Sequence, residues 1–217
     1  MAEATKTDMT GTEIPPYFNP EMRRHDLAWK DWPAVCRFLA DEMVCRVAVH
    51  DDPFPYVVAQ SYVFLGDRFF FHCTRFGKLA ALIRANSNLT IEIDRPIGLL
   101  KAPKGQNTSL EYYSVIARCS ASIRDDTDDV RSMQYVALGK YRPEQDYTAL
   151  EDGAVNQIVA FDCKIVEMSA KKRILADGQY SPPGQPQAPY LRYPVPPGAS
   201  ISALPEEAFD PRRFDKR

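Results

Sequence analysis

The sequence predicts a mainly β fold: a small β-barrel with short helices. Three observations lead to this class. Apolar and polar residues alternate over several short stretches, turn residues separate most of these stretches, and helical spacing is confined to brief segments. The predicted strands cover residues 45–50, 56–65, 68–73, 89–94, 110–125 and 155–170. Closing six strands into a barrel removes the exposed edges that an open sheet would leave.

Two short helices are predicted in the first half of the chain. The first covers residues 32–43, where Asp31 can cap the helix and Pro33 is tolerated in the first turn. The second covers residues 79–86 and can end at Asn86.

The first three strands are predicted to form a meander of hairpins, with turns at residues 51–55 and 66–67. Residues 95–108 are rich in Pro, Gly and Lys and predict a loop before the fifth strand. A third helix is predicted over residues 128–141, capped by Thr127, with apolar residues along one stripe.

Composition divides the chain into three parts. Residues 1–25 are polar and contain three prolines, so we expect a flexible N-terminal segment. A single folded domain is predicted over residues 26–176. Nine of the 18 prolines lie within residues 181–217, which excludes a helix or a central strand there. Because this region still carries spaced aromatic and aliphatic residues, residues 177–217 predict an extended arm that lies on a protein surface.

Composition and charge also exclude several classes of function. The net charge of −2 argues against a general nucleic-acid binder, although one local phosphate pocket is compatible with it. No apolar run approaches the roughly 20 residues that cross a bilayer, and the N-terminus lacks a signal-peptide pattern, so we expect a cytoplasmic protein without membrane partners. The five cysteines form no CxxC pair, and His25, His50 and His72 are scattered, so reduced thiols and no metal site are expected.

The order of several short motifs resembles a known family. A strand containing PYVV is followed by FFFHC, by the Gly77-Lys78 pair, by a helix ending in Asn86 and by LTIEID. With MRRHD upstream and YYSVIARCSASI downstream, this order resembles the pyridoxamine 5′-phosphate oxidase-related flavin-binding proteins, most closely the 5-nitroimidazole resistance branch. The resemblance covers about residues 22–175 and implies an FMN-binding split barrel that works as a homodimer. The Arg-rich C-terminal segment of true pyridoxamine phosphate oxidases is not clearly present, so vitamin B6 synthesis is not implied.

The resemblance places the flavin phosphate at the loop TRFGK. Gly77 lets the backbone approach closely, and Lys78 supplies a cation at a helix start, where free N–H groups also favour anions. Thr74 can donate a hydroxyl, and Arg75 can add charge. The alternative is an ordinary turn followed by a solvated lysine.

The flavin ring is expected along the strand that contains PYVV and along the strand over residues 45–49. The resemblance implies contacts with Val58, Ala59, Gln60 and Ser61. Ala59 and Ser61 stand where relatives commonly have proline and asparagine. The alternative is an ordinary alternating strand with one buried face.

His72 is the predicted catalytic residue, because the resemblance puts this histidine beside the flavin, where it could tune the ring or donate a proton. Tyr113 and Ser114, next to Tyr112, resemble positions that reach the flavin across the dimer interface. The alternatives are a satisfied polar residue on a barrel strand for His72 and core or interface aromatics for the tyrosines.

Two kinds of function follow from this resemblance. The first is an FMN-dependent oxidoreductase that passes electrons from reduced nicotinamide to a small acceptor such as a nitroaromatic or a quinone. The second is a non-catalytic protein that binds flavin, haem or deazaflavin, or carries electrons, on the same fold. The residues do not identify the substrate.

Overall fold

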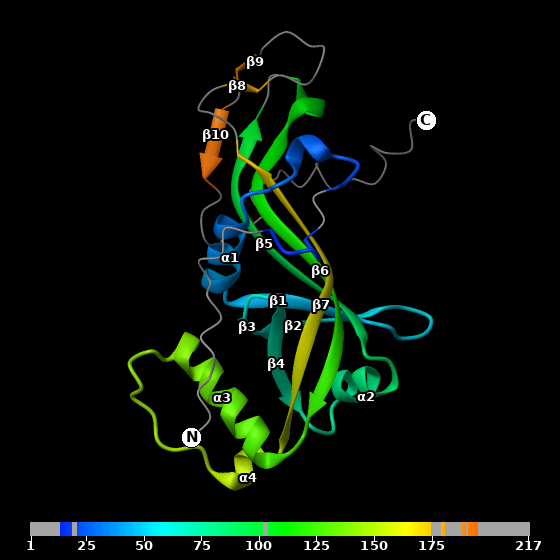
Figure 1. The fold of residues 1–217 in the computed structure, drawn as a ribbon. Coiled ribbons are helices and arrows are strands. Elements are labelled where there is room, and N and C mark those ends of the chain that lie inside the picture. Colours follow the sequence, from blue (N-terminus) through cyan, green and yellow to red (C-terminus); the bar gives the residue numbers. More distant parts are fainter. Residues whose placement is uncertain are drawn as a thin grey trace, which may run out of the picture. The chain divides into compact units, whose positions relative to one another are not determined.

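The computed structural model describes residues 14–18, 21–101, 104–174, 179–180, 188–189 and 191–194 of the 217-residue chain. The chain divides into two compact units (Figure 1). The first unit comprises residues 1–95 and 112–173, and the second comprises residues 96–111 and 174–217. Every residue of the predicted site belongs to the first unit.

The predicted class, a mainly β split barrel with short helices, is confirmed. The helical elements are η1 (His25–Leu27), α1 (Trp32–Asp41), α2 (Lys78–Ala85), η2 (Gly105–Asn107), α3 (Thr127–Tyr141) and α4 (Asp152–Val155). The strands of the main sheet are β1 (Val44–Val49), β2 (Tyr56–Ser61), β3 (Val63–Phe64), β4 (Arg68–Thr74), β5 (Asn88–Lys101), β6 (Ser109–Arg124) and β7 (Ile158–Arg173). No helix in the described part of the chain has the length and the apolar character needed to cross a membrane.

The sheet curls, and the strands at its two ends, β2 and β3, follow each other directly in the sequence. The strand order is β2-β1-β5-β6-β7-β4-β3, and β2 and β3 are separated only by Tyr62. A single strand was predicted over residues 56–65, but it breaks at Tyr62, with β2 pairing β1 and β3 pairing β4. One short segment therefore belongs to both ends of the sheet, which curls into a half-barrel.

A hydroxyl group from α3 satisfies the backbone at this break. The Tyr62 amide donates to the Tyr141 hydroxyl at 2.8 Å. The same hydroxyl lies 2.7 Å from the carbonyl oxygens of Tyr62 and Met43 and can donate to one of them. Tyr141 thus replaces ladder hydrogen bonds that the strand break would otherwise leave unmade.

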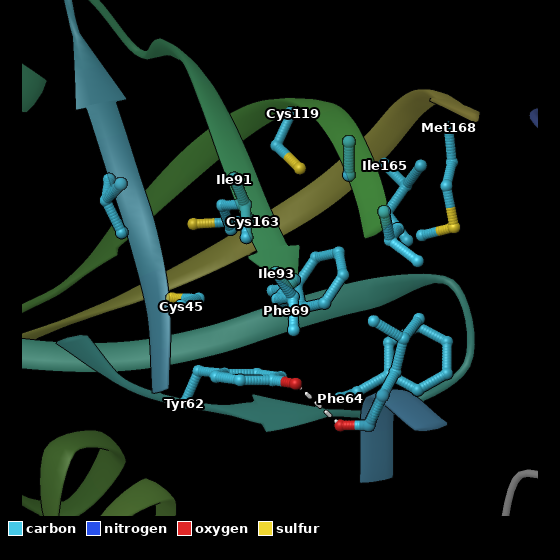
Figure 2. Packing of buried hydrophobic residues seen from close by; sticks show 14 of the residues in the cluster. Cys45, Tyr62, Phe64, Phe69, Ile91, Ile93, Cys119, Cys163, Ile165 and Met168 are labelled. Atoms are coloured by element: carbon cyan, nitrogen blue, oxygen red, sulfur yellow. Dashed lines mark hydrogen bonds between the residues drawn. The ribbon is translucent and has the colours of Figure 1, made fainter. Parts of the chain in front are cut away.

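The barrel interior is filled by aromatic and aliphatic side chains with buried thiols among them (Figure 2). Phe69 is fully buried, and the Tyr62 hydroxyl donates to the Leu39 carbonyl at 2.8 Å. Burial raises the pKa of both Cys45 and Cys119 to about 12. These thiols therefore stay protonated and serve as small core side chains.

A second, smaller apolar cluster lies under α3. It consists of Val63, Phe70, Val130, Val155 and Ala160. Phe70 faces opposite to its core neighbours on β4, which is the period-two alternation of a strand covered on both faces. α3 is thus attached through Val130 at its start and through the Tyr141 hydroxyl at its end.

Local capping predictions were correct for α1 and shifted by one residue for α3. The Asp31 carboxylate accepts from the Ala34 amide, as expected of an N-cap. At α3 the cap is Asp126, whose carboxylate accepts from two backbone amides, while the Thr127 hydroxyl bonds the Asn156 side chain at 2.6 Å. A carboxylate directly before Thr127 takes the capping position because it also favours the positive end of the helix.

The second unit contains a strand where a loop was expected. β5 continues to Lys101, through much of the predicted loop over residues 95–108, because β10 (Leu191–Pro194) pairs antiparallel with residues 98–101. β8 (Gln179–Tyr180) pairs with β9 (Ala188–Pro189). These three strands are all that the structure describes of the predicted arm from residue 179 onward, and the rest of the arm lies outside the described residues.

The N-terminal segment contains an anchor that composition did not predict. Phe18 is buried and forms a bridge to Met168 of β7, and the Tyr17 hydroxyl donates to the Gly66 carbonyl at 2.7 Å. The expectation of flexibility over residues 1–25 therefore does not hold for this part. Residues 1–13, 19 and 20 lie outside the described residues.

Candidate functional site

The loop between β4 and α2 makes a tight turn that brings Gly77 close to Thr74. Gly77 precedes the first residue of α2, and its amide donates to the Thr74 carbonyl at 3.2 Å. A Cβ placed on Gly77 would stand 2.6 Å from Thr74 Cγ2, so a larger residue would require the Thr74 side chain to move. Glycine serves here for close approach rather than for an unusual backbone angle.

Lys78 begins α2 and is held by two neighbours. Its Nζ lies 2.7 Å from Asp51 Oδ2 and 5.0 Å from the centre of the Tyr56 ring. The hydrogen bond to Asp51 raises the pKa of Lys78 further above its ordinary value, which already keeps the ammonium charged at neutral pH. The side chain is still 57% exposed, which leaves it accessible to an anion that competes with Asp51.

Hydrogen bonds from Arg75 stabilise the same loop. Its guanidinium donates to the Asp125 carbonyl at 2.8 Å, and its amide donates to the Gln157 carbonyl at 2.9 Å. Arg84 in turn donates to the Arg75 carbonyl at 2.8 Å. These contacts fix the course of the loop, so the Arg75 guanidinium is engaged with backbone rather than aimed at Lys78.

The predicted ring-binding residues alternate between the two faces of β2. Ala59 and Ser61 are exposed together with Val57, whereas Val58 packs against the core and Gln60 is partly buried. Among the described strands β2 pairs only with β1, so its second edge presents free backbone N–H and C=O groups. Val58 and Gln60 can therefore meet a ligand through their backbone, and Ala59 and Ser61 through their side chains.

His72 and Ser61 meet at one small cavity. His72 is partly buried, and as it alternates with Phe71 it faces α3 rather than the barrel interior. The cavity has a volume of about 160 Å³ and is lined by Ser61, His72, Gln134, Ala137, Leu138, Tyr141 and Leu150. The four α3 residues follow helical spacing, which was the available signal for Gln134 and Leu138.

The electrostatics of this cavity favour uncharged groups. Burial lowers the pKa of His72, so the imidazole is neutral at pH 7. Gln134 Oε1 is buried without a partner, and it has no accessible surface through which a ligand in the cavity could reach it. His72 and Ser61 supply polar side chains to the lining.

The burial of His72 predicts that the free energy of unfolding depends on pH. Since the folded state lowers the His72 pKa below 6.5, the unfolded state binds the proton more readily. Stability is then fully present above pH 6.5 and is lost as the pH falls toward the folded pKa. Chemical denaturation between pH 5 and 8 should show this decline in wild type and a shallower one in His72→Gln. The exposed control, His25→Gln, should keep the wild-type slope; an unchanged slope in His72→Gln would contradict the assignment.

Tyr113 and Ser114 lie far from the other predicted residues. The Tyr113 ring packs 4.7 Å from the Trp29 ring, centre to centre. Ser114 pairs with Lys171 of β7, whereas His72 pairs with Ala160, eleven residues away along the same strand. Eleven residues of strand span about 36 Å. Within one chain the two parts of the predicted site therefore do not come together.

A larger cleft of about 460 Å³ opens across β1, β5, β6 and β7. It is lined by Ala48, Val49, His50, Pro55, Asn88, Leu89, Thr90, Arg118, Cys119 and Val166. Its β1 wall includes part of the stretch over residues 45–49 that was expected beside the ring. His50 is followed by Asp51, the partner of Lys78, so the cleft adjoins the Lys78 loop. The polar residues Asn88, Thr90 and Arg118 were not predicted, because only the fold brings them to this wall.

Comparison with known proteins agrees with this fold. A model of the pyridoxamine 5′-phosphate oxidase family matches residues 31–172. No similar sequence was found among curated proteins. A flavocytochrome from Azotobacter vinelandii is a similar solved structure, with 19% identity, a TM-score of 0.67, and coverage of 86% of this chain and 90% of that chain.

Two further solved structures share the fold. A candidate 5-nitroimidazole antibiotic resistance protein from Bacteroides thetaiotaomicron is 18% identical, with a TM-score of 0.57 over 67% of this chain and 86% of that chain. An FAD and haem binding protein from Mycobacterium smegmatis is 15% identical, with a TM-score of 0.56 over 78% of this chain and 89% of that chain. With the family match spanning most of the barrel, the resemblance seen in the sequence is confirmed, and the chain belongs to the pyridoxamine 5′-phosphate oxidase family.

Proposed function

We propose that the protein is a homodimeric flavoprotein that binds FMN and passes electrons from reduced nicotinamide to a small acceptor. The observation that carries the proposal is the Lys78 loop beside the 460 Å³ cleft. A charged, accessible ammonium at a helix start suits a phosphate, and a cleft of this size with a largely apolar wall suits a flat ring. Proteins with the same fold include a flavocytochrome and an FAD and haem binding protein, which supports a flavin as the ligand class.

The residues fit a flavin mononucleotide in their chemistry. Lys78 and the first amides of α2 would hold the phosphate, and Gly77 keeps the loop backbone close to it. The ring would lie in the cleft against Ala48 and Val49 of β1, whereas Ala59 and Ser61 of the neighbouring strand β2 are not among the residues that line the cleft. When bound, the flavin supplies hydride and single-electron chemistry, and the protein orients it.

The absorption spectrum of the purified protein tests the cofactor. A flavin gives two bands in the near ultraviolet and the blue, and heat-released cofactor identified by chromatography separates FMN from FAD. An intense Soret band would instead favour haem, for which the neutral His72 imidazole is a suitable ligand. Oxidation of reduced nicotinamide with added quinone or nitroaromatic then separates an enzyme from a carrier. A protein that binds no flavin after reconstitution would contradict the proposal.

The placement of Ser114 favours a site built from two chains. Because Ser114 and His72 are about 36 Å apart along β7, a site that uses both needs a second copy of the chain. A two-fold dimer would supply two such sites.

Mixed dimers should test this arrangement. We expect His72→Ala and Ser114→Glu each to reduce nicotinamide oxidation when purified alone. After unfolding and refolding in a 1:1 mixture, about one site in four should be intact, because half of the dimers are mixed and each has one unmodified site. Activity that stays at the sum of the two single variants would show that Ser114 and His72 do not share a site. Circular dichroism confirms that both variants fold.

A further inference from the structure

The 460 Å³ cleft has a second end, away from the strand where the flavin ring is expected. The ring is expected at the β1 end, against Ala48 and beside the Lys78 loop. The opposite end is formed by Arg118 of β6 and Val166 of β7. β6 lies two strand positions from β1, with β5 between them, which corresponds to about 10 Å in a sheet. This end is therefore a candidate site for a second ligand that meets the flavin.

A β-bulge shapes this end of the cleft. The register of β6 against β7 shifts between Arg118 and Cys119, so that Val166 is the extra residue on β7. Val166 and Glu167 are both exposed, which breaks the alternation between core and solvent along β7. Val166 is 64% exposed and lines the cleft together with Arg118. The bulge thus places an apolar side chain beside a guanidinium, and bulges next to active sites commonly re-aim side chains in this way.

The charges at this end define the chemistry of the ligand. Among the described residues that line the cleft none is acidic, and Arg118 carries a permanent positive charge. The Arg118 side chain is 70% exposed, so a ligand in the cleft can reach its N–H groups. Its Nη1 lies 3.5 Å from Glu167 Oε2, a long contact that does not use the full fork of donors. An anionic group is the natural partner, and Glu167 would repel a second negative charge, so a carboxylate fits better than a phosphate dianion.

The surface around Arg118 suits an apolar ring. Ala48, Leu89 and Val166 contribute apolar side chains to the cleft. Thr90 pairs with Ala48 across β1 and β5 and adds a hydroxyl to the same wall. An aromatic ring fits this surface better than an alkyl chain, because it loses less conformational freedom when it binds. The ligand class is therefore an aromatic carboxylate.

We propose that the Arg118 end of the cleft binds the electron acceptor as an aromatic carboxylate, with the carboxylate on the guanidinium and the ring against Val166. This inference rests on the proposed function and deepens it by naming the acceptor class, an aromatic acid that carries a nitro group. Reduced nicotinamide supplies a hydride through the flavin, and the solvent supplies a proton. The nitro group becomes a nitroso group as one N–O bond breaks and water leaves. Arg118 determines specificity, because it selects the acceptor by charge and takes no part in the electron transfer.

Two matched nitroaromatics test the proposal: 4-nitrobenzoate and its neutral counterpart, 4-nitrobenzamide. Each is titrated into the protein as purified, and binding is followed by calorimetry without reduced nicotinamide. 4-Nitrobenzoate should bind about 5- to 30-fold more tightly, which is less than a buried charge-assisted hydrogen bond would give, because Arg118 is exposed. The preference should shrink as salt is added, since an exposed ion pair is screened.

Four variants show whether the preference comes from Arg118. Arg118→Gln should abolish it by weakening the binding of 4-nitrobenzoate and leaving that of 4-nitrobenzamide unchanged. Glu167→Gln should enlarge it, because the variant removes the negative charge beside the guanidinium. Val166→Thr should weaken both probes by a similar factor, since it makes the apolar wall polar at nearly constant shape. Arg37→Gln, at an exposed arginine of α1, is the matched control and should keep the wild-type preference.

Equal affinity of the two probes for wild type, or an unchanged preference in Arg118→Gln, would overturn the inference. Turnover with reduced nicotinamide distinguishes this failure from a failure of the proposed function. If 4-nitrobenzoate binds with the Arg118-dependent preference but is not reduced, the carboxylate site stands and the oxidoreductase function fails. If both probes are reduced with equal kcat/KM, the oxidoreductase function stands and Arg118 does not select the acceptor.

Discussion

FMN binding should weaken about 10- to 150-fold when Lys78 is replaced with alanine, because a charge-assisted hydrogen bond to the phosphate is worth about 1.5–3 kcal/mol. Lys78 is the first residue of α2, and its exposed ammonium is paired with Asp51. Titration of the apoprotein with FMN, followed by quenching of flavin fluorescence, measures the dissociation constant. Riboflavin, which lacks the phosphate, should lose far less affinity.

Removing the ion pair between Lys78 and Asp51 should change FMN affinity in the opposite direction. Asp51 Oδ2 lies 2.7 Å from Lys78 Nζ and competes with an incoming phosphate while repelling its charge. Asp51→Asn should therefore strengthen FMN binding, more so at low salt, where repulsion between charges is less screened. Lys30→Ala, at an exposed lysine, is the matched control and should leave affinity unchanged. Equal FMN affinity in Lys78→Ala and Lys30→Ala would place the phosphate elsewhere.

Tyr141→Phe should lower the free energy of unfolding by about 2–6 kcal/mol, because it removes one hydroxyl that serves two backbone groups. The Tyr62 amide and the carbonyl that accepts from this hydroxyl would both lose their partner, and each unpaired buried group costs about 1–3 kcal/mol. Urea denaturation measures the change. Tyr135→Phe, on the same helix with 40% exposure, should change stability by only a few tenths of a kcal/mol. Similar losses in the two variants would show that water replaces the hydroxyl.

Local sequence patterns predicted most of the barrel because they reflect local physics. Alternation at Phe69, Phe71 and their neighbours marks β4, and Asp31 marks the start of α1. The break at Tyr62 could not be predicted, since its backbone is satisfied by a residue 79 positions away in the chain. The extension of β5 depends in the same way on the distant pairing with β10.

In the candidate site, too, features with a local sequence signal were predictable, and features that depend on distant contacts were not. The turn at Gly77 was predictable, because a Gly-Lys pair before a helix is a local signal. The ion pair between Lys78 and Asp51 was not, since it depends on where the turn over residues 51–55 lies in the fold. Gln134 was also missed. Gln134 lies on the same face of α3 as Ala137, Leu138 and Tyr141, but only the folded structure shows that this face borders a cavity.

The strand break also couples two pairings that would otherwise be independent. Val44 pairs with Ser61 on one side of Tyr62, and Val63 pairs with Phe70 on the other. Because only Tyr62 separates β2 from β3, the chain has no slack between the two pairings. β2 therefore cannot move along its own axis without moving β3 against β4, so Tyr62 transmits a displacement of one end of the sheet to the other.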